Sequence, residues 1–435
     1  MNSASGGKVA SGFYRSQWNN TAGLAVKGKN HLILQPYAVS SYREHVFTLL
    51  EFGSAAVLAL LPPKLSQEKP LSPLMKDHHI FDRRTFIKGT IVATAFPQII
   101  TSVKGDTLPV VGEGDYRYEV IHHWAKLPSQ FTWQTTHNVA VDRNGFLYVI
   151  HEGKASLNDH PSIFVFDPQG RYVRSFGKQF QGGGHGLEVR NENGDEFLYV
   201  TAYQHLKRFA KLTLKGETVW EKRAPMGSNH YAEGEAENPK GVWGRDRFMP
   251  TNFAFHPDGG FYLADGYGAW TVHRYNQKGE WVFSFGTPGK GDGEFQLPHG
   301  IWLDDRKGRT PSIAVADRAN ARLQWFTLGG RHLSTLDGMI LPANIDTHGK
   351  LMLVPDLSAR ITLLDENNRI VAHLGEDPDW RIEVLKDQRK LRTTPSEWVS
   401  GKFIHPHDAC FDHNGDIFVA EWVSTGRITK LRHLV

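Results

Sequence analysis

One stretch of the chain carries most of the structural information: Val139-Ala-Val-Asp142-Arg-Asn-Gly145-Phe-Leu-Tyr148-Val. Apolar residues alternate on both sides of a turn made of Asp, Asn and Gly, which is the signal of a β-hairpin. The pattern returns clearly in two places, Phe253-Ala-Phe-His256-Pro-Asp-Gly-Gly260-Phe-Tyr262-Leu and Ala409-Cys-Phe-Asp412-His-Asn-Gly415-Asp-Ile-Phe418-Val. Weaker copies lie at residues 187–200, 301–315 and 345–353.

A second repeated unit follows each copy of the first. Its clearest copy is Phe166-Asp-Pro-Gln-Gly170-Arg-Tyr-Val-Arg-Ser-Phe176-Gly, and its relatives begin at Leu212, Tyr275, Phe326 and Leu364. The two units together predict four strands in roughly 40 to 60 residues, which is the size of a propeller blade. A β-sandwich or two separate domains would not explain why both units recur in a fixed order.

We therefore predict an all-β chain, a six-bladed β-propeller over residues 115–435. The sixth blade runs out of sequence after three strands, around residues 426–431. A strand at residues 116–124 is expected to supply its missing outer strand and so close the ring. Closure would hide two sheet edges that would otherwise be free to pair with other chains.

The first hundred residues differ from the repeats. Residues 82–88 read Asp-Arg-Arg-Thr-Phe-Ile-Lys and precede an uncharged, moderately apolar stretch, which resembles a twin-arginine export signal. Such a signal stands near the start of a chain, so we expect translation to begin at Met75. Residues 1–74 would then be a leader outside the working protein, and residues 75–110 the signal and a linker to an exported, periplasmic propeller. The alternative is a basic pair in front of a buried helix.

Composition narrows the function classes. The 435 residues include 50 basic and 46 acidic ones, and a net charge of +4 is too small to indicate a nucleic-acid partner. The apolar run at residues 46–61 is shorter than the ~20 residues of a membrane span. The single cysteine, Cys410, excludes an intramolecular disulfide and a CxxC metal site. We expect a monomer that takes a small-molecule or peptide substrate, with no membrane contact beyond the export signal.

Histidines recur at one phase of the repeat, five positions before the Asp of the first unit. The six equivalent residues are His137, His185, Thr251, His299, Ala343 and His407. Inner strands of a propeller line its channel, so His185, His299 and His407 on alternate blades should converge with threefold spacing. Three imidazoles form the protein half of a catalytic zinc site. His137 would be a fourth ligand or a neighbouring group, and the alternative is that these histidines only form hydrogen bonds within the channel.

A second group of polar residues follows the second strand of each blade. Tyr267 and Arg318 would supply an acid/base and a carboxylate-binding group beside the metal. Turn chemistry is sufficient to explain Asp265 and Asp317, and Cys410 is expected in the core because it alternates away from His407.

These motifs resemble a known family. Over residues of about 120–435 the series Asp265-Gly-Tyr267, Pro298-His299-Gly, Ala316-Asp-Arg318-Ala-Asn-Ala-Arg322 and Pro406-His407-Asp408 is similar to peptidyl-α-hydroxyglycine α-amidating lyases, which are NHL-repeat propellers. The resemblance implies zinc on His185, His299 and His407, and calcium on Asp408 and the carbonyls of Val139 and Leu187. It further implies Tyr267 as the base, Arg318 as an active-site arginine, and a reaction that cleaves a carbinolamide to an amide and glyoxylate.

The chain departs from this family at two positions. Glu152, within His151-Glu152-Gly153, stands where the family has an arginine, and His405 stands where it has a methionine. A carboxylate at position 152 is expected to repel a substrate carboxylate, unless Lys154 on the same strand face compensates. Two further hypotheses follow: a non-enzymatic propeller that binds a peptide or protein partner and has a structural metal, and a lactonase- or lyase-like propeller built around calcium.

Overall fold

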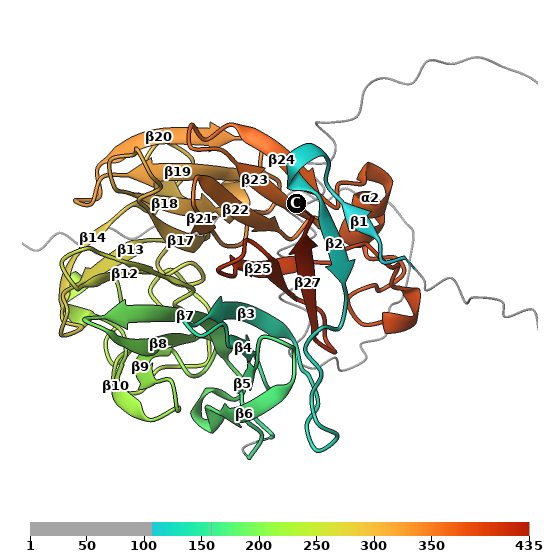
Figure 1. Ribbon diagram of the computed structural model, residues 1–435. Coiled ribbons are helices and arrows are strands. Elements are labelled where there is room, and N and C mark those ends of the chain that lie inside the picture. Colours follow the sequence, from blue (N-terminus) through green and yellow to red (C-terminus); the bar gives the residue numbers. More distant parts are fainter. Residues whose placement is uncertain (1–106, 158, 435) are drawn as a thin grey trace, which may run out of the picture. The chain divides into compact units, whose positions relative to one another are not determined.

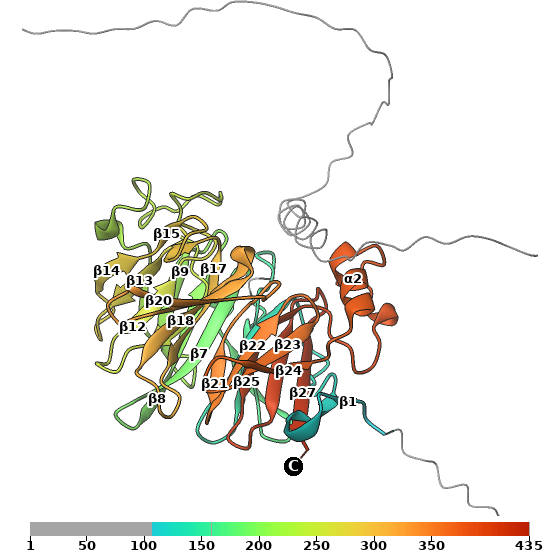
Figure 2. The same ribbon diagram turned by 90° about the horizontal axis from the view of Figure 1, so that it is seen from above.

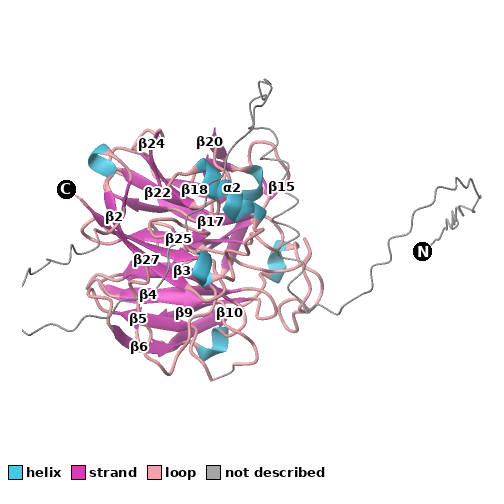
Figure 3. Ribbon diagram, turned by 90° about the vertical axis from the view of Figure 1, so that its right-hand side faces the viewer, coloured by secondary structure: helices cyan, strands magenta, loops and turns pink. Residues whose placement is uncertain are grey.

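The structure is a computed structural model that describes residues 107–157 and 159–434. Within these ranges the strands form six antiparallel sheets and one small two-stranded ribbon (Figures 1 and 3). The predicted six-bladed β-propeller is therefore confirmed. The predictions of a leader, a twin-arginine signal and a start at Met75 concern residues that lie outside the described ranges.

Five blades have four strands, hydrogen-bonded in chain order. Blades one and two are β3 (Thr136–Val141), β4 (Leu147–His151), β5 (Ile163–Phe166), β6 (Tyr172–Phe176) and β7 (Gly184–Glu192), β8 (Asp195–Ala202), β9 (Arg208–Thr213), β10 (Thr218–Lys222). Blades three and four are β11 (Phe253–Phe255), β12 (Phe261–Ala264), β13 (Val272–Tyr275), β14 (Trp281–Phe285) and β17 (Pro298–Asp304), β18 (Ser312–Asp317), β19 (Arg322–Phe326), β20 (His332–Asp337). Blade five is β21 (Asp346–His348), β22 (Leu351–Asp356), β23 (Arg360–Leu364) and β24 (Ile370–Leu374).

The sixth blade combines strands from both ends of the described range. It contains β25 (Pro406–Phe411), β26 (Ile417–Glu421), β27 (Arg427–His433), β2 (Tyr118–Ile121) and β1 (Val110–Val111). β2 pairs antiparallel with β27, with Val120 opposite Leu431 (Figure 1). β1 was not predicted from the sequence, and it extends the sheet to residues before 115.

The repeated Asp and Gly of the sequence form the hairpin turns. Asp142 Oδ1 accepts hydrogen bonds from the amides of Asn144 and Phe146, both at 2.9 Å. Gly145 has a φ of +79°, which an L side chain rarely adopts. His256 replaces the Asp in blade three, and its Nδ1 accepts the amide of Asp258 at 3.0 Å. The turn thus depends on a side-chain acceptor rather than on aspartate itself.

The inner strands β3, β7, β11, β17, β21 and β25 surround the channel, and the outer strands form the rim (Figure 1). Alternate apolar residues of neighbouring sheets pack together, as Val165 of blade one does with Val200 and Leu212 of blade two. Each blade therefore buries its two faces against its neighbours, which fixes the inner strands around a common axis.

Three smaller features depart from the repeat. The ribbon joins β15 (Thr287–Pro288) to β16 (Glu294–Phe295), and short 3-10 turns occur at Gly114–Tyr116, Lys178–Phe180, Met226–Ser228, Arg318–Asn320 and Pro395–Glu397. α2 (Pro378–Lys386) lies at the side of the ring and is capped by Asp377, which accepts the amide of Trp380 (Figure 2). Among the described residues no helix has the length and apolar character that crossing a membrane requires.

His122, directly after β2, links the closing strand to the rest of its blade. Its Nδ1 donates to Thr429 Oγ1 at 2.9 Å, and its Nε2 accepts the amide of Gly401 at 3.0 Å. Burial, aided by the charge of Arg427, lowers the pKa of His122 from 6.5 to about 4. Between these pH values the unfolded chain binds a proton that the folded chain does not, so the free energy of unfolding falls as the pH falls.

We expect protonation of His122 alone to lower the free energy of unfolding by on the order of 2–3 kcal/mol between pH 6.5 and 4, because one pKa unit corresponds to 1.36 kcal/mol. Urea unfolding of the wild type and of His122→Gln at pH 6.5 and 4.5 would measure the difference. Glutamine does not titrate, so the variant should lose less stability over this window. Equal losses in the two proteins would contradict the assignment.

Candidate metal centre and active site

The three histidines predicted to converge lie together and are fully buried at the channel axis. His185 Nε2 and His299 Nε2 are 3.1 Å apart. The ring centroid of His407 is 5.0 Å from that of His185 and 4.8 Å from that of His299. Repeat phase on alternate inner strands was therefore sufficient to identify this group.

Each of these rings is anchored to the next blade by the same kind of hydrogen bond. The Nδ1 atoms of His185, His299 and His407 lie 3.2, 2.7 and 2.8 Å from the carbonyl oxygens of Thr251, Ala343 and His137, respectively. Those three acceptors occupy the repeat position equivalent to the histidines themselves. Carbonyl oxygens from the three blades that carry no member of the trio thus orient the three histidine rings.

The anchoring decides which ring nitrogen can bind a metal. A carbonyl oxygen only accepts, so Nδ1 carries the proton and a neutral ring presents the lone pair of Nε2 to the axis. Burial lowers the pKa of all three imidazoles, and Arg318 and the neighbouring rings lower those of His299 and His407 further, which keeps them neutral. Lone pairs that face each other repel unless a cation lies between them.

The distance between two of these nitrogens, those of His185 and His299, agrees with zinc coordination. Zinc–nitrogen bonds of 2.0–2.1 Å at a tetrahedral centre place the nitrogens about 3.4 Å apart. The 3.1 Å between the Nε2 atoms of His185 and His299 is close to this value, and His407 Nε2 is buried with no hydrogen-bond partner. The donor set therefore fits a metal that prefers imidazole.

A fourth imidazole, His137 of β3, completes the ring of histidines. Its centroid is 4.9 Å from that of His185 and 4.6 Å from that of His407. One nitrogen each of His137, His185 and His407 lie within 4.8 Å of one another, so these three residues also form a possible metal-binding group. The repeat phase pointed to His137 as well, but the sequence left its role open.

Tyr267 and Arg318 lie beside this cluster and are hydrogen-bonded in series. Arg318 Nη1 donates to the phenol oxygen of Tyr267 at 3.3 Å, and that phenol is 2.9 Å from His299 Nε2. Arg318 is only 6% exposed, and its Nη2 is buried without a partner. A buried guanidinium with a vacant donor is suited to binding a carboxylate or carbonyl oxygen.

Glu152 accepts hydrogen bonds from two residues of the neighbouring blade. Its Oε1 accepts from Tyr203 Oη at 3.2 Å and from the side-chain amide of Gln204. Its Oε2 lies 3.5 Å from His137 Nε2. Lys154 is an exposed loop residue, because β4 ends at His151, so the expectation that both side chains share a strand face was wrong.

A long loop between β10 and β11 adds an aromatic wall that the repeats did not reveal. Trp243, 40% exposed, has its ring centroid 5.3 Å from that of Tyr267. The loop is fixed by the fully buried pair Lys207–Glu235, whose charged atoms are 2.8 Å apart. Lys207 also donates to the carbonyl oxygen of Val242 at 3.1 Å, next to Trp243.

A second polar site lies elsewhere along the inner strands, around Asp408. This carboxylate accepts the amide of Val139 at 2.8 Å and the side-chain amide of Asn344 at 2.6 Å. Asp408 lines a cavity of about 100 Å³ together with Glu188, Asp346 and Asn344, whose Oδ1 is buried and unpartnered. Burial raises the pKa of all three carboxyl groups, that of Asp346 to about 7.

The resemblance implied Val139 and Leu187 as carbonyl ligands next to Asp408. Both lie on neighbouring inner strands, β3 and β7, but the contact that the structure records for Val139 is its amide rather than its carbonyl. The sequence did not identify Glu188, Asp346 or Asn344. Glu188 lies on β7, Asp346 begins β21 and Asn344 lies two residues before it, and only the assembled ring brings all three to one cavity.

Other residues that the sequence brought forward have structural partners. His405 Nδ1 is 2.7 Å from the carbonyl of Leu357, and His151 Nε2 is 3.0 Å from that of Pro161. Asp265 and Asp317 accept hydrogen bonds within their own turns, from the amide of Ala269 and the side chain of Asn320, and also from the more distant amides of Met249 and Gln296. Cys410 is buried, in agreement with the prediction.

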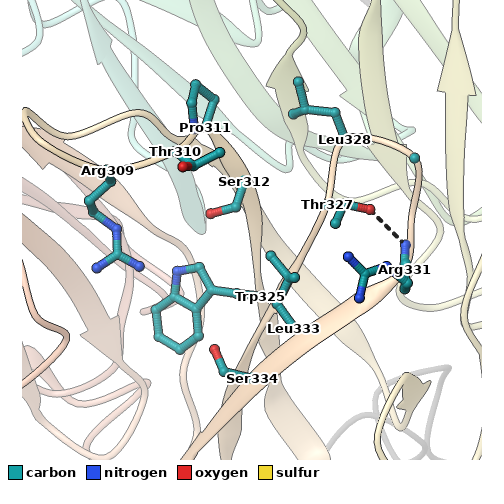
Figure 4. A pocket seen from close by; sticks show the side chains of 11 residues that line it. Arg309, Thr310, Pro311, Ser312, Trp325, Thr327, Leu328, Arg331, Leu333 and Ser334 are labelled. Carbon is teal, nitrogen blue, oxygen red and sulfur yellow. Dashed lines mark hydrogen bonds between the residues drawn. The ribbon is translucent and has the colours of Figure 1, made fainter.

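A larger hollow of about 830 Å³ lies on the outer part of blade four (Figure 4). Its lining residues include Arg309, Trp325 and Arg331 but no histidine, cysteine or carboxylate. It therefore offers no metal ligand and no acid or base in the usual pKa range, and the channel remains the candidate site.

Sequence comparison finds several relatives of this chain. No family model matches the chain. The chain is 24% identical over 316 residues to "Probable peptidyl-alpha-hydroxyglycine alpha-amidating lyase pgal-1" of Caenorhabditis elegans, an alignment that covers 68% of this chain and 82% of the relative. It is 25% identical over 290 residues to "Peptidyl-alpha-hydroxyglycine alpha-amidating lyase 1" of Drosophila melanogaster, covering 62% of this chain and 49% of the relative.

Further similarity is found to a human protein and to solved propellers. "NHL repeat-containing protein 3" of Homo sapiens is 27% identical over 215 residues, covering 48% of this chain and 56% of the relative. A streptogramin B lyase structure superposes with a TM-score of 0.45 at 13% identity, covering 74% of this chain and 99% of that one. The predicted resemblance to an NHL-repeat propeller and to amidating lyases is confirmed by the sequence relatives.

Proposed function

We propose that this propeller, a relative of the peptidyl-α-hydroxyglycine α-amidating lyases, is a zinc-dependent carbon–nitrogen lyase. Its substrate would be a peptidyl-α-hydroxyglycine or a related α-hydroxy amide, cleaved to an amide and glyoxylate. The observation that carries the proposal is the contact between the histidine trio and a Tyr267–Arg318 relay. A purely structural metal site would not need a phenol on one of its ligands and a vacant guanidinium beside it.

Each group of residues in the channel has a role in this proposal. His185, His299 and His407 would hold zinc, which supplies a Lewis acid for the α-hydroxyl oxygen when bound. Arg318 Nη2 is available to bind the substrate carboxylate. Glu152 accepts hydrogen bonds from Tyr203 and Gln204 and lies 3.5 Å from His137, so the proposal gives it no part in binding the substrate carboxylate.

The proposed reaction balances with one proton moved. Tyr267, as phenolate, takes the proton of the α-hydroxyl group, and the electron pair left on that oxygen forms the C=O bond of glyoxylate. The C–N bond breaks, its electron pair stays on nitrogen, and the phenol of Tyr267 returns the proton to this nitrogen to give the primary amide. Proton transfer by a positioned side chain typically contributes about 10²- to 10⁴-fold to the rate.

The charges around Tyr267 determine whether it can act as a base. Burial raises the pKa of Tyr267, the guanidinium of Arg318 acts in the opposite direction, and the carboxylate of Glu152 raises the pKa further. A divalent cation on the adjacent His299 would add a second positive charge and favour the phenolate. In this proposal, Tyr267 is expected to act as a base when the metal is bound.

A direct assay tests the function. Zinc-loaded full-length protein is incubated with benzoyl-α-hydroxyglycine, and glyoxylate and benzamide are quantified against a protein-free sample. The proposal predicts equal amounts of both products, formed catalytically. If the zinc-loaded protein forms neither product above background, the chain is better explained as a binding propeller for a peptide or protein partner, with a structural channel metal.

We further propose that the Asp408 cavity holds calcium. Carboxylate and amide oxygens are hard ligands of the kind calcium prefers, and the unpartnered Asn344 Oδ1 needs a donor or a cation. Calcium at 100 times its Kd is expected to stabilise the wild type by about 2.7 kcal/mol. The same addition should leave Asp408→Asn much less stabilised, and Asp258→Asn, at an outer turn, should respond like the wild type. Equal thermal shifts in all three proteins would contradict the site.

Export is proposed from the sequence at residues 82–88, where the arginine pair precedes an apolar stretch. Periplasmic protein should then disappear in a variant with both Arg83 and Arg84 changed to Lys, while cytoplasmic protein accumulates. An unchanged distribution would remove the export proposal. We also expect the exported form to sediment as a monomer.

A further inference from the structure

His137 breaks the anchoring pattern of the other channel histidines. Each member of the trio donates Nδ1–H to a carbonyl of the next blade, whereas both ring nitrogens of His137 are buried and have no hydrogen-bond partner. The carbonyl of His137 serves His407, but its own ring is turned toward Glu152. A buried imidazole nitrogen left unpaired is costly, so a missing partner is indicated.

Glu152 is the carboxylate beside the His137 ring. Its Oε2 lies 3.5 Å from His137 Nε2, and both ring nitrogens of His137 are buried without a hydrogen-bond partner, so either is available to a metal. Glu152 itself is fixed by Tyr203 and Gln204, so its position does not depend on His137 alone. A carboxylate that orients a histidine in this way is a common arrangement behind metal-binding imidazoles.

The position of the ring agrees with a place in the metal shell. A nitrogen of His137 lies within 4.8 Å of the ligand nitrogens of His185 and His407. The ring packs at 59° and 63° against theirs, so that all three rings approach the axis from different directions. Nδ1 and Nε2 of His137 and Nε2 of His407 are buried without a hydrogen-bond partner.

We propose that His137 is a fourth imidazole ligand of the channel metal, and that Glu152 is the residue that positions it. Glu152, which stands where the resembling family has an arginine, would thereby belong to the metal site rather than to substrate recognition. The substrate hydroxyl would take a fifth position. The inference requires the channel metal of the proposed function but not the proposed reaction.

X-ray absorption of the zinc-loaded full-length protein tests the ligand count. Four imidazoles per zinc are expected in the wild type and three in His137→Gln. His405→Gln is the matched control, because His405 is buried two residues from His407 but bonds to Leu357 instead of joining the cluster. Three imidazoles in the wild type, or the same count in His137→Gln, would overturn the proposal.

Zinc affinity tests the part played by Glu152. Loss of such an orienting partner typically weakens metal binding about 10- to 100-fold, which is expected for Glu152→Gln in competition with a chelator. Thermal unfolding of the metal-free variants shows whether each one is folded. Unchanged zinc affinity in folded Glu152→Gln would overturn the positioning role.

Glyoxylate release by the same samples separates this inference from the proposed function. An active wild type with three imidazoles would remove the fourth ligand and leave the lyase proposal intact. An inactive wild type with four imidazoles would remove the lyase proposal and leave the fourth ligand intact. A wild type that binds no zinc would overturn both.

Discussion

Replacing Tyr267 by phenylalanine is expected to lower kcat for glyoxylate release by roughly 10²- to 10⁴-fold, the usual contribution of a positioned acid or base. The phenol lies 2.9 Å from His299 Nε2 and accepts from Arg318 at 3.3 Å, so its loss removes the proposed base. The ring itself packs against Tyr203 and Trp243, and phenylalanine preserves that packing. Steady-state kinetics with zinc-saturated protein would measure the change.

Two measurements separate this effect from damage to the site. Zinc stoichiometry should stay at one per chain, because the phenol is not a ligand in the proposed site. Tyr262→Phe is the control: its hydroxyl donates to the carbonyl of Leu328, away from the channel, and its loss should leave kcat unchanged. A Tyr267→Phe protein with wild-type kcat would show that the proton goes to another group.

His185→Ala is expected to abolish stoichiometric zinc binding and, with it, glyoxylate release. His185 is central to the cluster, since its ring lies within 5.0 Å of those of His137, His299 and His407. We expect its removal to weaken zinc binding by more than the roughly 100-fold that the loss of an orienting partner can cost. Metal analysis after dialysis against a chelating buffer would show the loss.

His332→Ala provides the control for histidine removal. His332 lies on the outer strand β20 and is 2.9 Å from Thr335 Oγ1, so it has no part in the channel. This variant should retain one zinc and full activity. Retention of stoichiometric zinc by His185→Ala would mean that the metal is bound elsewhere in the chain.

The repeat pattern was sufficient to predict the blades and the histidine trio, because phase in a repeat translates directly into depth along the channel. His185, His299 and His407 converge for this reason, and so does His137. The same argument placed Tyr267 and Arg318 at the ends of second strands, and the structure brings both beside the histidine cluster.

The partners of Glu152 could not be predicted in this way. Tyr203 and Gln204 follow β8 of another blade, and only the assembled ring shows that their donors reach the carboxylate. Trp243, which forms the aromatic wall, lies in a loop that is not part of the repeated units. The buried Lys207–Glu235 pair holds this loop in place. Such contacts depend on the packing of neighbouring blades, which a single repeat does not encode.

Titration of the metal-free protein with zinc tests the central claim most directly, with bound zinc and glyoxylate release followed in the same sample. The account predicts that activity rises in proportion to bound zinc and reaches its plateau at one zinc per chain. Full activity in the metal-free protein would contradict it, and so would one bound zinc per chain without any glyoxylate release.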